Sequence, residues 1–313
     1  MSDALLKATL LCAGNVKLEA KLPPGYVCRD VAGPHGEQKT VFMEFGRHRV
    51  KLGIGASQFR VAEENGKFFL FENEKKVTAI SFLKPVFHAP EMAFFNLLDW
   101  CQYNCSFCNL PYGSKHVVCV EKYVELMRRK AGEIRSIAVT SGVGENDVDV
   151  KLMKAFVEAA RKEFSMPIGV EPFVSQKKQI EELHEAGATE IKINIHSFDK
   201  HVLERECPVF LRDTLSLLEH AVKVFGEGRV TTNVLVGLGE SQEGLLDGIE
   251  KLAFMGVIPN LRLVRGRGSI SPLSLLQMAE AQKKILRKSG LKPDMETMCL
   301  RCKSCDIVPE WDL

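Results

Sequence analysis

From about residue 92 onward the chain alternates short apolar runs with longer amphipathic segments, and this alternation is its strongest constraint on the fold. The apolar runs predict strands at 92–100, 134–142, 167–173, 190–197, 229–237 and 260–265. Apolar residues at helical spacing predict helices near 120–132, 148–164, 175–186, 212–226, 241–255 and 272–289. Strand-then-helix repetition with apolar strands indicates a parallel sheet that is covered by helices.

Six such units are two short of the eight in a full barrel. We therefore expect an α/β fold with a partial (β/α)6 TIM-like barrel over residues 92–290. Residues 1–91 have strand character with turns rich in Gly, Asn and Glu, which predicts a small β-rich N-terminal module. Residues 291–313 form a Cys-rich tail after the last helix.

Composition excludes several classes of function. The formal net charge of +2 gives no basic field for nucleic acid, and no apolar run approaches the roughly 20 residues that span a bilayer. Six of the ten cysteines fall into two close groups, which is typical of metal sites, whereas disulfide frameworks spread cysteines through small secreted domains. We therefore expect a reducing, cytoplasmic setting. The other cysteines are more typical of packed small side chains: Cys12, Cys28, Cys119 and Cys207.

The first group, Cys101, Cys105 and Cys108, has cysteines at offsets of four and three. Three thiolates on one loop can ligate three irons of a cubane cluster, which leaves the fourth iron for an exchangeable molecule. A structural zinc site, the alternative, needs four closed ligands. The loop follows the first barrel strand, at the face where β/α proteins assemble active sites.

With Phe107 directly before the last cysteine, this segment resembles the CxxxCxxC loop of the radical S-adenosylmethionine (SAM) superfamily. The resemblance implies a [4Fe–4S] cluster whose open iron binds the amino and carboxylate groups of SAM, with the Phe107 loop against the adenine. It also implies that an electron from the cluster cleaves SAM to methionine and a 5′-deoxyadenosyl radical. That radical takes hydrogen from an unactivated carbon, so the three cysteines form the catalytic centre.

Two more segments fit the resemblance. Ser141 and Gly142 close the second strand, where the family has a glycine-containing motif that meets the SAM amino group. Residues 233–240 (NVLVGLGE) resemble the family pattern GxIxGxxE, with Asn in place of the first Gly, so Gly237 and Glu240 would support the adenine pocket. An ordinary turn and an acid at a helix N-terminus are the alternatives.

Polar residues at the ends of the third and fourth strands are further candidates. The resemblance implies that Asn194, His196 and Ser197 contact the ribose or carboxylate of SAM, and Glu171 is another residue that could line the site. A buried polar group satisfied within the core is the alternative for all four.

The second group, Cys299, Cys302 and Cys305, has equal steps of three. We interpret it as three ligands of an auxiliary [4Fe–4S] cluster near the barrel mouth. The fourth ligand stays open between the four other cysteines and a non-cysteine group, and zinc held by four thiolates is the alternative. Because the tail is short, we expect the bound cluster to be what orders it.

Residues 88–290 are similar to the biotin synthase/lipoyl synthase-like branch, most of all to the archaeal-type two-protein lipoyl synthase family. That resemblance implies a radical SAM sulfurtransferase that inserts one sulfur into a protein-bound octanoyl chain, with the auxiliary cluster as sulfur donor. It implies three partners: an octanoylated lipoyl-carrier domain or peptide, a sister radical SAM component, and an electron donor such as ferredoxin. The alternatives are a biotin synthase-like enzyme of another cofactor pathway with an electron-relay cluster, and a non-catalytic metal-binding protein.

Overall fold

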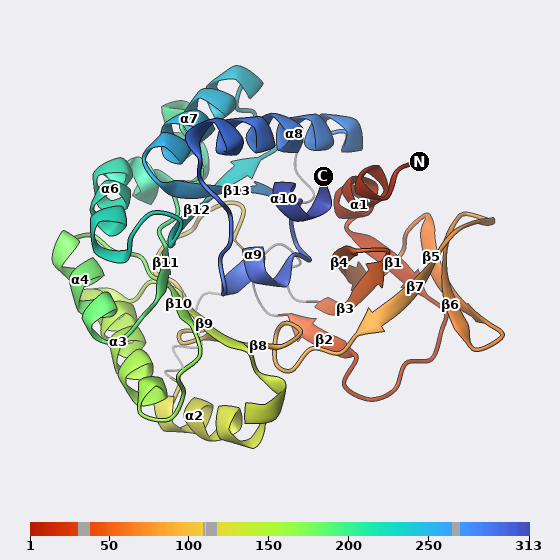
Figure 1. The fold of residues 1–313 in the computed structure, drawn as a ribbon, viewed down its shortest axis with the longest axis horizontal. Coiled ribbons are helices and arrows are strands. Elements are labelled where there is room, and N and C mark those ends of the chain that lie inside the picture. Colours follow the sequence, from red (N-terminus) through yellow and green to blue (C-terminus); the bar gives the residue numbers. More distant parts are fainter. Residues whose placement is uncertain (31–37, 109, 111–117, 265–269) are drawn as a thin grey trace.

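The computed structural model describes residues 1–30, 38–108, 110, 118–264 and 270–313. Its larger part is a curved parallel sheet of six strands in the order β13-β12-β11-β10-β9-β8 (Figure 1). The strands are β8 (Met92–Asn96), β9 (Ser136–Thr140), β10 (Ile168–Glu171), β11 (Glu190–Lys192), β12 (Val230–Val236) and β13 (Val257–Leu263). The predicted partial barrel of six strands is confirmed.

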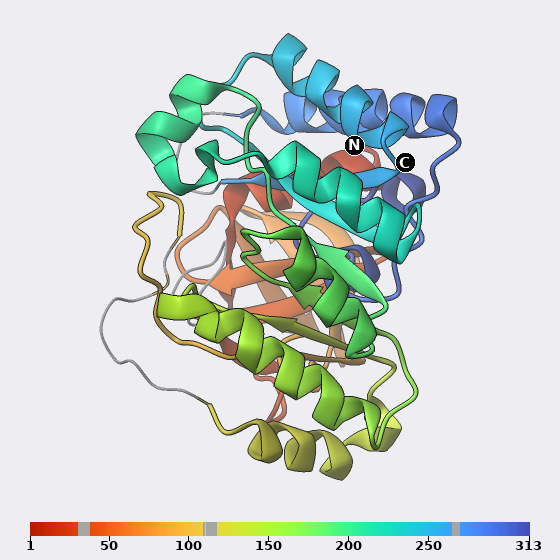
Figure 2. The ribbon, with the colours of Figure 1, turned by 90° about the vertical axis from the view of Figure 1, so that its left-hand side faces the viewer.

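Helices cover the outer face of this sheet (Figure 2). The helices of the six units are α2 (Val120–Arg129), α3 (Val148–Arg161), α4 (Lys177–Glu185), α6 (Thr214–Phe225), α7 (Gln242–Phe254) and α8 (Pro272–Ser289). A further short helix is α5 (Lys200–Glu206), and 3-10 turns lie at Ala131–Glu133, Glu145–Asp147 and Pro208–Leu211. No helix within the described ranges is both long and apolar enough to cross a bilayer.

Local sequence signals set these elements. Every residue of β12 is buried, as expected for a central strand with helices on one side and the barrel interior on the other. Helix α8 begins after Ser271, whose hydroxyl accepts a hydrogen bond from Ser274 N, and has Pro272 at its first position. It ends at Gly290, which has the left-handed conformation that glycine favours at this place.

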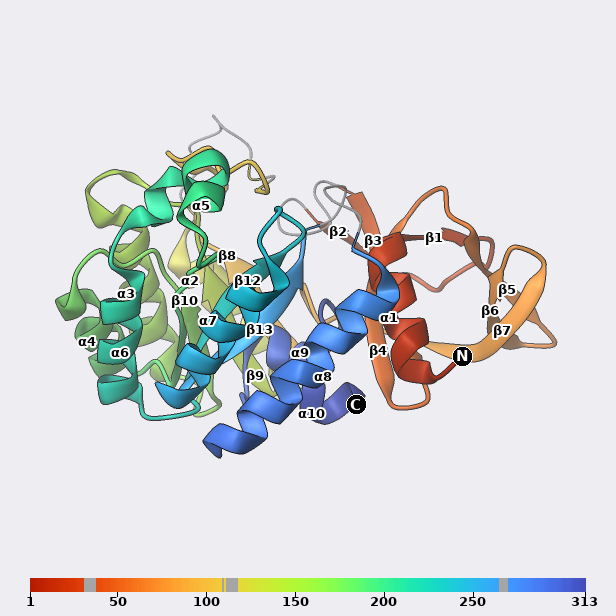
Figure 3. The same cartoon turned by 90° about the horizontal axis from the view of Figure 1, so that it is seen from above.

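The N-terminal residues form a second, mostly antiparallel sheet in the order β2-β3-β4-β1-β5-β6-β7. Its strands are β1 (Asn15–Leu18), β2 (Val27–Asp30), β3 (Gln38–Phe45), β4 (His48–Ile54), β5 (Phe59–Glu64), β6 (Lys67–Glu72) and β7 (Lys75–Leu83). Helix α1 (Asp3–Ala13) precedes it and packs against α8 and β4 (Figure 3). Residues 84–90 (KPVFHAP) are part of the segment with expected strand character, but they form no strand and have only an isolated bridge at Ala89.

The C-terminal tail passes between the barrel and the N-terminal sheet, as α9 (Met298–Cys302) and α10 (Pro309–Asp312) (Figure 1). Asp312 is buried between Lys7, whose Nζ is 2.6 Å from Oδ2, and His48, whose Nδ1 is 3.0 Å from Oδ1. Between the two helices Ser304 and Asp306 are also buried. The expectation that only a bound cluster would order this tail is therefore wrong, because protein contacts bury most of it.

Candidate functional site

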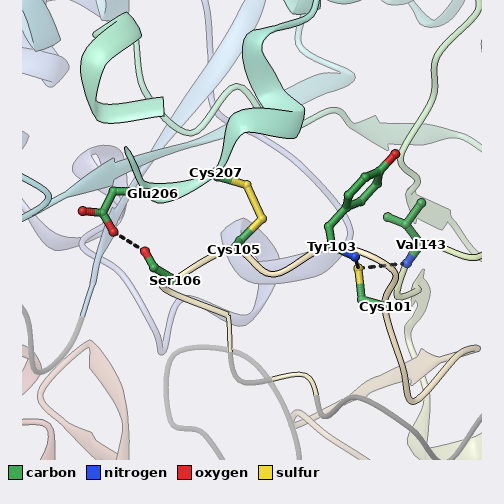
Figure 4. The surroundings of a disulfide bond; sticks show 7 residues. All are labelled: Cys101, Tyr103, Cys105, Ser106, Val143, Glu206 and Cys207. Carbon is green, nitrogen blue, oxygen red and sulfur yellow. Dashed lines mark hydrogen bonds between the residues drawn. A yellow bond between two sulfur atoms is a disulfide. The ribbon is translucent and has the colours of Figure 1, made fainter. Parts of the chain in front are cut away.

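The first cysteine loop leaves the carboxyl end of β8 and lies against the loop that follows β9. The sulfur of Cys101 accepts hydrogen bonds from the backbone N–H groups of Tyr103 and Val143, both at 3.4 Å (Figure 4). Such N–H···S bonds stabilise a thiolate and are among the features that tune iron–sulfur clusters. Cys108 N donates to Cys105 O at 3.0 Å, which turns the loop back on itself.

Cys105 is joined to Cys207 by a disulfide (Figure 4). Cys207 directly follows α5 and is fully buried. The interpretation of Cys207 as a packed lone cysteine is therefore wrong in this structure. Cys105 can serve as a cluster ligand only after this disulfide is reduced, because a ligand must be a thiolate.

The donor set of this loop fits a [4Fe–4S] cluster, although its thiols do not yet converge. Within the described residues no three thiols, imidazoles or carboxylates surround one point as a metal site requires. In the first loop, the disulfide holds one of the three thiols against the end of α5. Near the loop, Asn96 Oδ1 and Ser141 Oγ are buried at the ends of β8 and β9 without a hydrogen-bond partner in the described part of the chain. Buried polar atoms of this kind can accept hydrogen bonds from a bound polar ligand.

Gly142 allows the two loops to approach each other. A Cβ atom at this position would lie 1.8 Å from the carbonyl oxygen of Trp100, a distance that no side chain tolerates. Its N–H donates to Leu98 O at 3.3 Å. Glycine is thus required for this loop to approach Trp100 so closely, beside the hydrogen bond from Val143 N to Cys101.

Phe107 lies at the carboxyl ends of β11 and β12, where its ring meets His196 edge to face with centroids 4.8 Å apart. Its apolar neighbours include Leu235 and Val202. Burial, followed by the charges of Arg212, Arg262 and Lys192, lowers the pKa of His196 to about 3, so this imidazole is neutral. His196 has φ of +62°, an uncommon conformation for a side chain other than glycine, and regular pairing of β11 ends before it, at Lys192.

Glu171 and Asn194 satisfy each other inside the barrel. The Glu171 carboxylate accepts from Asn194 Nδ2 at 2.9 Å and from Lys192 Nζ at 3.1 Å. Asn194 Oδ1 in turn accepts from Asn233 N at 3.1 Å. Burial alone would lower the pKa of Lys192, but the carboxylate of Glu171 and the thiol of Cys299 raise it. Both predicted residues thus belong to a closed network that holds a buried cation.

Glu240 folds back onto the loop between β12 and α7. Its two carboxylate oxygens accept from Gly237 N at 2.8 Å and from Leu238 N at 2.9 Å. Gly237 has φ of +104°, which explains the glycine. Ser197 is buried, and its hydroxyl accepts from Asp199 N at 3.1 Å. Ser197 and Glu240 line a cavity of about 290 Å³.

The second cysteine group lies on and after α9, on the side of the tail that meets the barrel. Thr297, two residues before Cys299, donates through its hydroxyl and its N–H to Glu190 Oε2 at the start of β11. Gly169 of β10 makes room for it, because a Cβ there would lie 2.0 Å from Thr297 Oγ1. The barrel strands therefore hold the tail at its entry to the cysteine group.

Buried cations surround this second group. Burial raises the pKa of Cys302, and it raises the pKa of Cys305 to about 12, while Lys51 and Arg262 act in the opposite direction on Cys305. Lys51 is fully buried on β4, and its backbone N–H donates to Ser304 O at 2.8 Å. The N-terminal sheet thus adds a cation to a thiol group on the opposite end of the chain.

Several residues of these sites gave no signal in the sequence. Arg212 lies between α5 and α6 with its guanidinium 4.2 Å above the ring of Phe173, which is 5.4 Å from the ring of Tyr103 in the first cysteine loop. Burial lowers the pKa of Arg212 to about 10, which leaves it cationic. Lys51, Lys192 and Asp306 were missed as well, because only long-range packing brings them to the thiols. The sequence also suggests Arg265, near the end of the sixth strand, as a partner for an anionic SAM carboxylate or substrate, but this residue lies outside the described residues.

Comparison with known proteins adds the following. Residues 95–252, about half of the chain, match the model of the Radical SAM superfamily. No curated protein sequence matches the chain. Among solved structures, methylornithine synthase (PylB) superposes with a TM-score of 0.50 at 14% identity, over 64% of this chain and 63% of that one.

Two further structures show similar overlap. SuiB of Streptococcus suis bound to S-adenosylmethionine has a TM-score of 0.53 at 12% identity, over 65% of this chain and 49% of that one. The FeFe-hydrogenase maturase HydG from Carboxydothermus hydrogenoformans has a TM-score of 0.49 at 19% identity, over 63% and 52%. The chain thus spans about half to under two thirds of the length of these proteins, and the likeness to PylB and SuiB shows the fold alone.

Proposed function

This chain belongs to the radical SAM superfamily, and from that premise we propose that it is a sulfur-insertion enzyme, one component of a two-protein lipoyl synthase. In this proposal it inserts one sulfur into an octanoyl chain on a lipoyl-carrier domain or peptide. The family implies a [4Fe–4S] cluster and SAM, which supply the reducing electron and the 5′-deoxyadenosyl radical when bound. Cys101, Cys105 and Cys108 are the three protein ligands of that cluster.

The observation that carries the proposal is that Lys192 and Arg262 act both on the second cysteine group and on His196, which contacts the first cysteine loop. The thiol of Cys299 lies close enough to raise the pKa of each of these cations. Both cations also lower the pKa of His196, whose ring contacts Phe107 in the first cysteine loop. This link between the two groups supports the proposal, in which a substrate carbon meets a hydrogen-abstracting radical on one side of the barrel interior and a sulfur source on the other.

On the first side of that interior, this chain's residues provide a site for SAM. Arg212, held on Phe173, is a suitable partner for the SAM carboxylate, because guanidinium groups bind carboxylates strongly. The buried oxygens of Asn96 and Ser141 can accept from the SAM amino group. The neutral ring of His196, with Phe107 and Leu235, forms an apolar surface for the adenine.

On the second side, Cys299, Cys302 and Cys305 would hold the auxiliary cluster that supplies the sulfur. Buried thiols become ligands only as thiolates, and the desolvation of a buried thiolate is unfavourable. Lys51, Lys192 and Arg262 offset that cost by placing positive charge beside the group. Asp306 keeps Arg262 in place.

The proposal is tested by anaerobic reconstitution with iron, sulfide, SAM, a ferredoxin-type reductant and an octanoyl-lysyl peptide, with and without a sister radical SAM component. We expect 5′-deoxyadenosine together with a peptide that has gained one sulfur atom, and a matching loss of sulfide from the protein. The matched control is a Cys299→Ser, Cys302→Ser, Cys305→Ser variant, which should still cleave SAM but add no sulfur.

Abundant 5′-deoxyadenosine with no sulfur in the peptide, even with the sister component present, would contradict the sulfur-insertion proposal. If sulfide content stays constant over many turnovers of another substrate, the second cysteine group instead serves an electron relay. A reducing, cytoplasmic location is part of the proposal, because both thiol groups must be reduced to bind iron.

A further inference from the structure

Beside the disulfide, hydrogen bonds between Ser106 and Glu206 also hold the cysteine loop to the end of α5. Ser106, the residue after Cys105, donates through its N–H to Glu206 O at 2.9 Å. Its hydroxyl also donates to the carboxylate of Glu206, the residue before Cys207 (Figure 4). Arg205 Nε donates to the other carboxylate oxygen at 2.7 Å. These hydrogen bonds do not depend on the disulfide, so they bring Cys105 and Cys207 together in the reduced chain as well.

The two thiols differ in exposure. Cys207 is fully buried, whereas Cys105 is only partly buried on the loop. The Cα atoms of the pair are 4.6 Å apart, which is within the usual range for a disulfide. Such an arrangement has the form of a redox-sensitive pair, in which an accessible thiol reacts first and a neighbouring thiol resolves the adduct.

We infer that Cys207 is a resolving cysteine. In protein that lacks the [4Fe–4S] cluster, Cys207 forms a reversible disulfide with Cys105, and this disulfide prevents Cys105 from binding the cluster. One sulfur cannot be both a thiolate ligand and half of a disulfide, so the loop has two exclusive states. The disulfide state protects Cys105 from irreversible over-oxidation, and reduction returns the loop to its cluster-binding form. The inference depends on the family's cluster alone and goes beyond the sulfur-insertion proposal.

Formation of the Cys105–Cys207 disulfide requires a two-electron oxidant, and a low-molecular-weight disulfide can serve as that oxidant. The Cys105 thiolate attacks that disulfide, forms a mixed disulfide and releases one thiolate. The Cys207 thiolate then attacks the Cys105 sulfur and displaces the second thiolate. The two protein thiols lose two electrons and two protons, and the reagent is reduced to two thiols.

The test compares the full-length apo wild type with Cys207→Ser and with Cys12→Ser, a control on α1. Each protein is treated with oxidised glutathione, mapped by peptide mass spectrometry, and then reconstituted anaerobically with iron and sulfide, with or without prior reduction by a thiol. For the wild type and Cys12→Ser we expect a peptide linking Cys105 to Cys207. We also expect iron uptake that is severalfold lower without prior reduction. Cys207→Ser should instead carry glutathione on Cys105.

A second variant, Ser106→Ala, removes the hydroxyl group that donates to Glu206 beside the pair. It should slow formation of the linked peptide severalfold. Circular dichroism checks that the fold of this variant is unchanged. The inference is overturned if no linked peptide forms in the wild type, or if the oxidised wild type takes up iron as well as the reduced protein. Failure of reduced, folded Cys207→Ser to take up iron also overturns it, because Cys207 would then be needed for the cluster. None of these outcomes depends on sulfur insertion.

Discussion

Arg262 donates two hydrogen bonds to Asp306, from Nε at 3.1 Å to Oδ1 and from Nη2 at 2.6 Å to Oδ2, and thereby fastens the C-terminal tail to strand β13. Asn260 Nδ2 donates to the same carboxylate at 2.9 Å. Because Asp306 directly follows Cys305, this ion pair fixes the second cysteine group relative to the barrel.

Asp306→Asn should lower the free energy of unfolding by about 3 kcal/mol, because it leaves the guanidinium of Arg262 buried without its counter-charge. Urea unfolding and limited proteolysis of the tail measure the effect. The double variant Arg262→Met, Asp306→Asn should recover part of the loss, because it removes the buried charge. If the single variant unfolds at the wild-type urea concentration, the ion pair does not hold the tail.

Gly142→Ala should destabilise the first cysteine loop, because the added Cβ would lie 1.8 Å from the carbonyl oxygen of Trp100. We expect a loss of at least about 2 kcal/mol in the free energy of unfolding, in the range of overpacking. Iron uptake after anaerobic reconstitution should also fall. Gly132→Ala is the matched control, because its Cβ would meet nothing within 4 Å. Equal behaviour of the two variants would show that the close approach of the loops is unimportant.

Arg212→Met should weaken SAM binding to the cluster-loaded protein about tenfold or more, as expected for loss of a hydrogen-bonded charge worth about 1.5–3 kcal/mol. Equilibrium dialysis with labelled SAM measures the dissociation constant, and Arg212→Lys should restore part of the affinity. Arg129→Met on the exposed face of α2 is the control. Unchanged affinity in Arg212→Met would remove this residue from the SAM site.

Asp149 gives the chain a specific pH dependence. Burial raises its pKa to about 6 from an ordinary 3.8, although Gly144 N donates to its carboxylate. The folded state therefore binds more protons than the unfolded state between these two values, and stability falls as pH rises through that window. Asp149→Asn should be about 2 kcal/mol more stable than the wild type at pH 7.5 and no more stable at pH 4. Chemical unfolding at both pH values checks this, and Asp247→Asn, at an exposed position on α7, is the control that should show no such difference.

Replacement of Cys101, Cys105 and Cys108 by alanine should abolish formation of 5′-deoxyadenosine and remove about four irons per chain after reconstitution. Visible absorbance and iron analysis measure the loss. If the second cysteine group binds its own cluster, the remaining iron stays with the triple variant. SAM cleavage that survives in this variant would refute the assignment of the loop.

The strand-then-helix order and the first cysteine loop could be predicted from the sequence, because both depend on local chemistry. Apolar periodicity along 92–290 is a property of neighbouring residues, and it determined six parallel strands with their helices. The spacing of Cys101, Cys105 and Cys108 together with Phe107 likewise needs only one loop. Even here, helix α1 and the missing strand over 84–90 were not foreseen, because tertiary contacts overrule local propensity in short segments.

The neighbours of each thiol were decided only by the tertiary structure. Cys207 is 102 residues from Cys105, and Lys51 precedes Cys305, whose pKa its charge lowers, by 254 residues (305 − 51). Their proximity results from closure of the barrel and from the docking of the N-terminal sheet and tail across its open side (Figure 1). Sequence spacing determines which donor residues share a loop. The burial of those donors and the charges near them depend on residues from the whole packed chain, so no local sequence pattern predicts them.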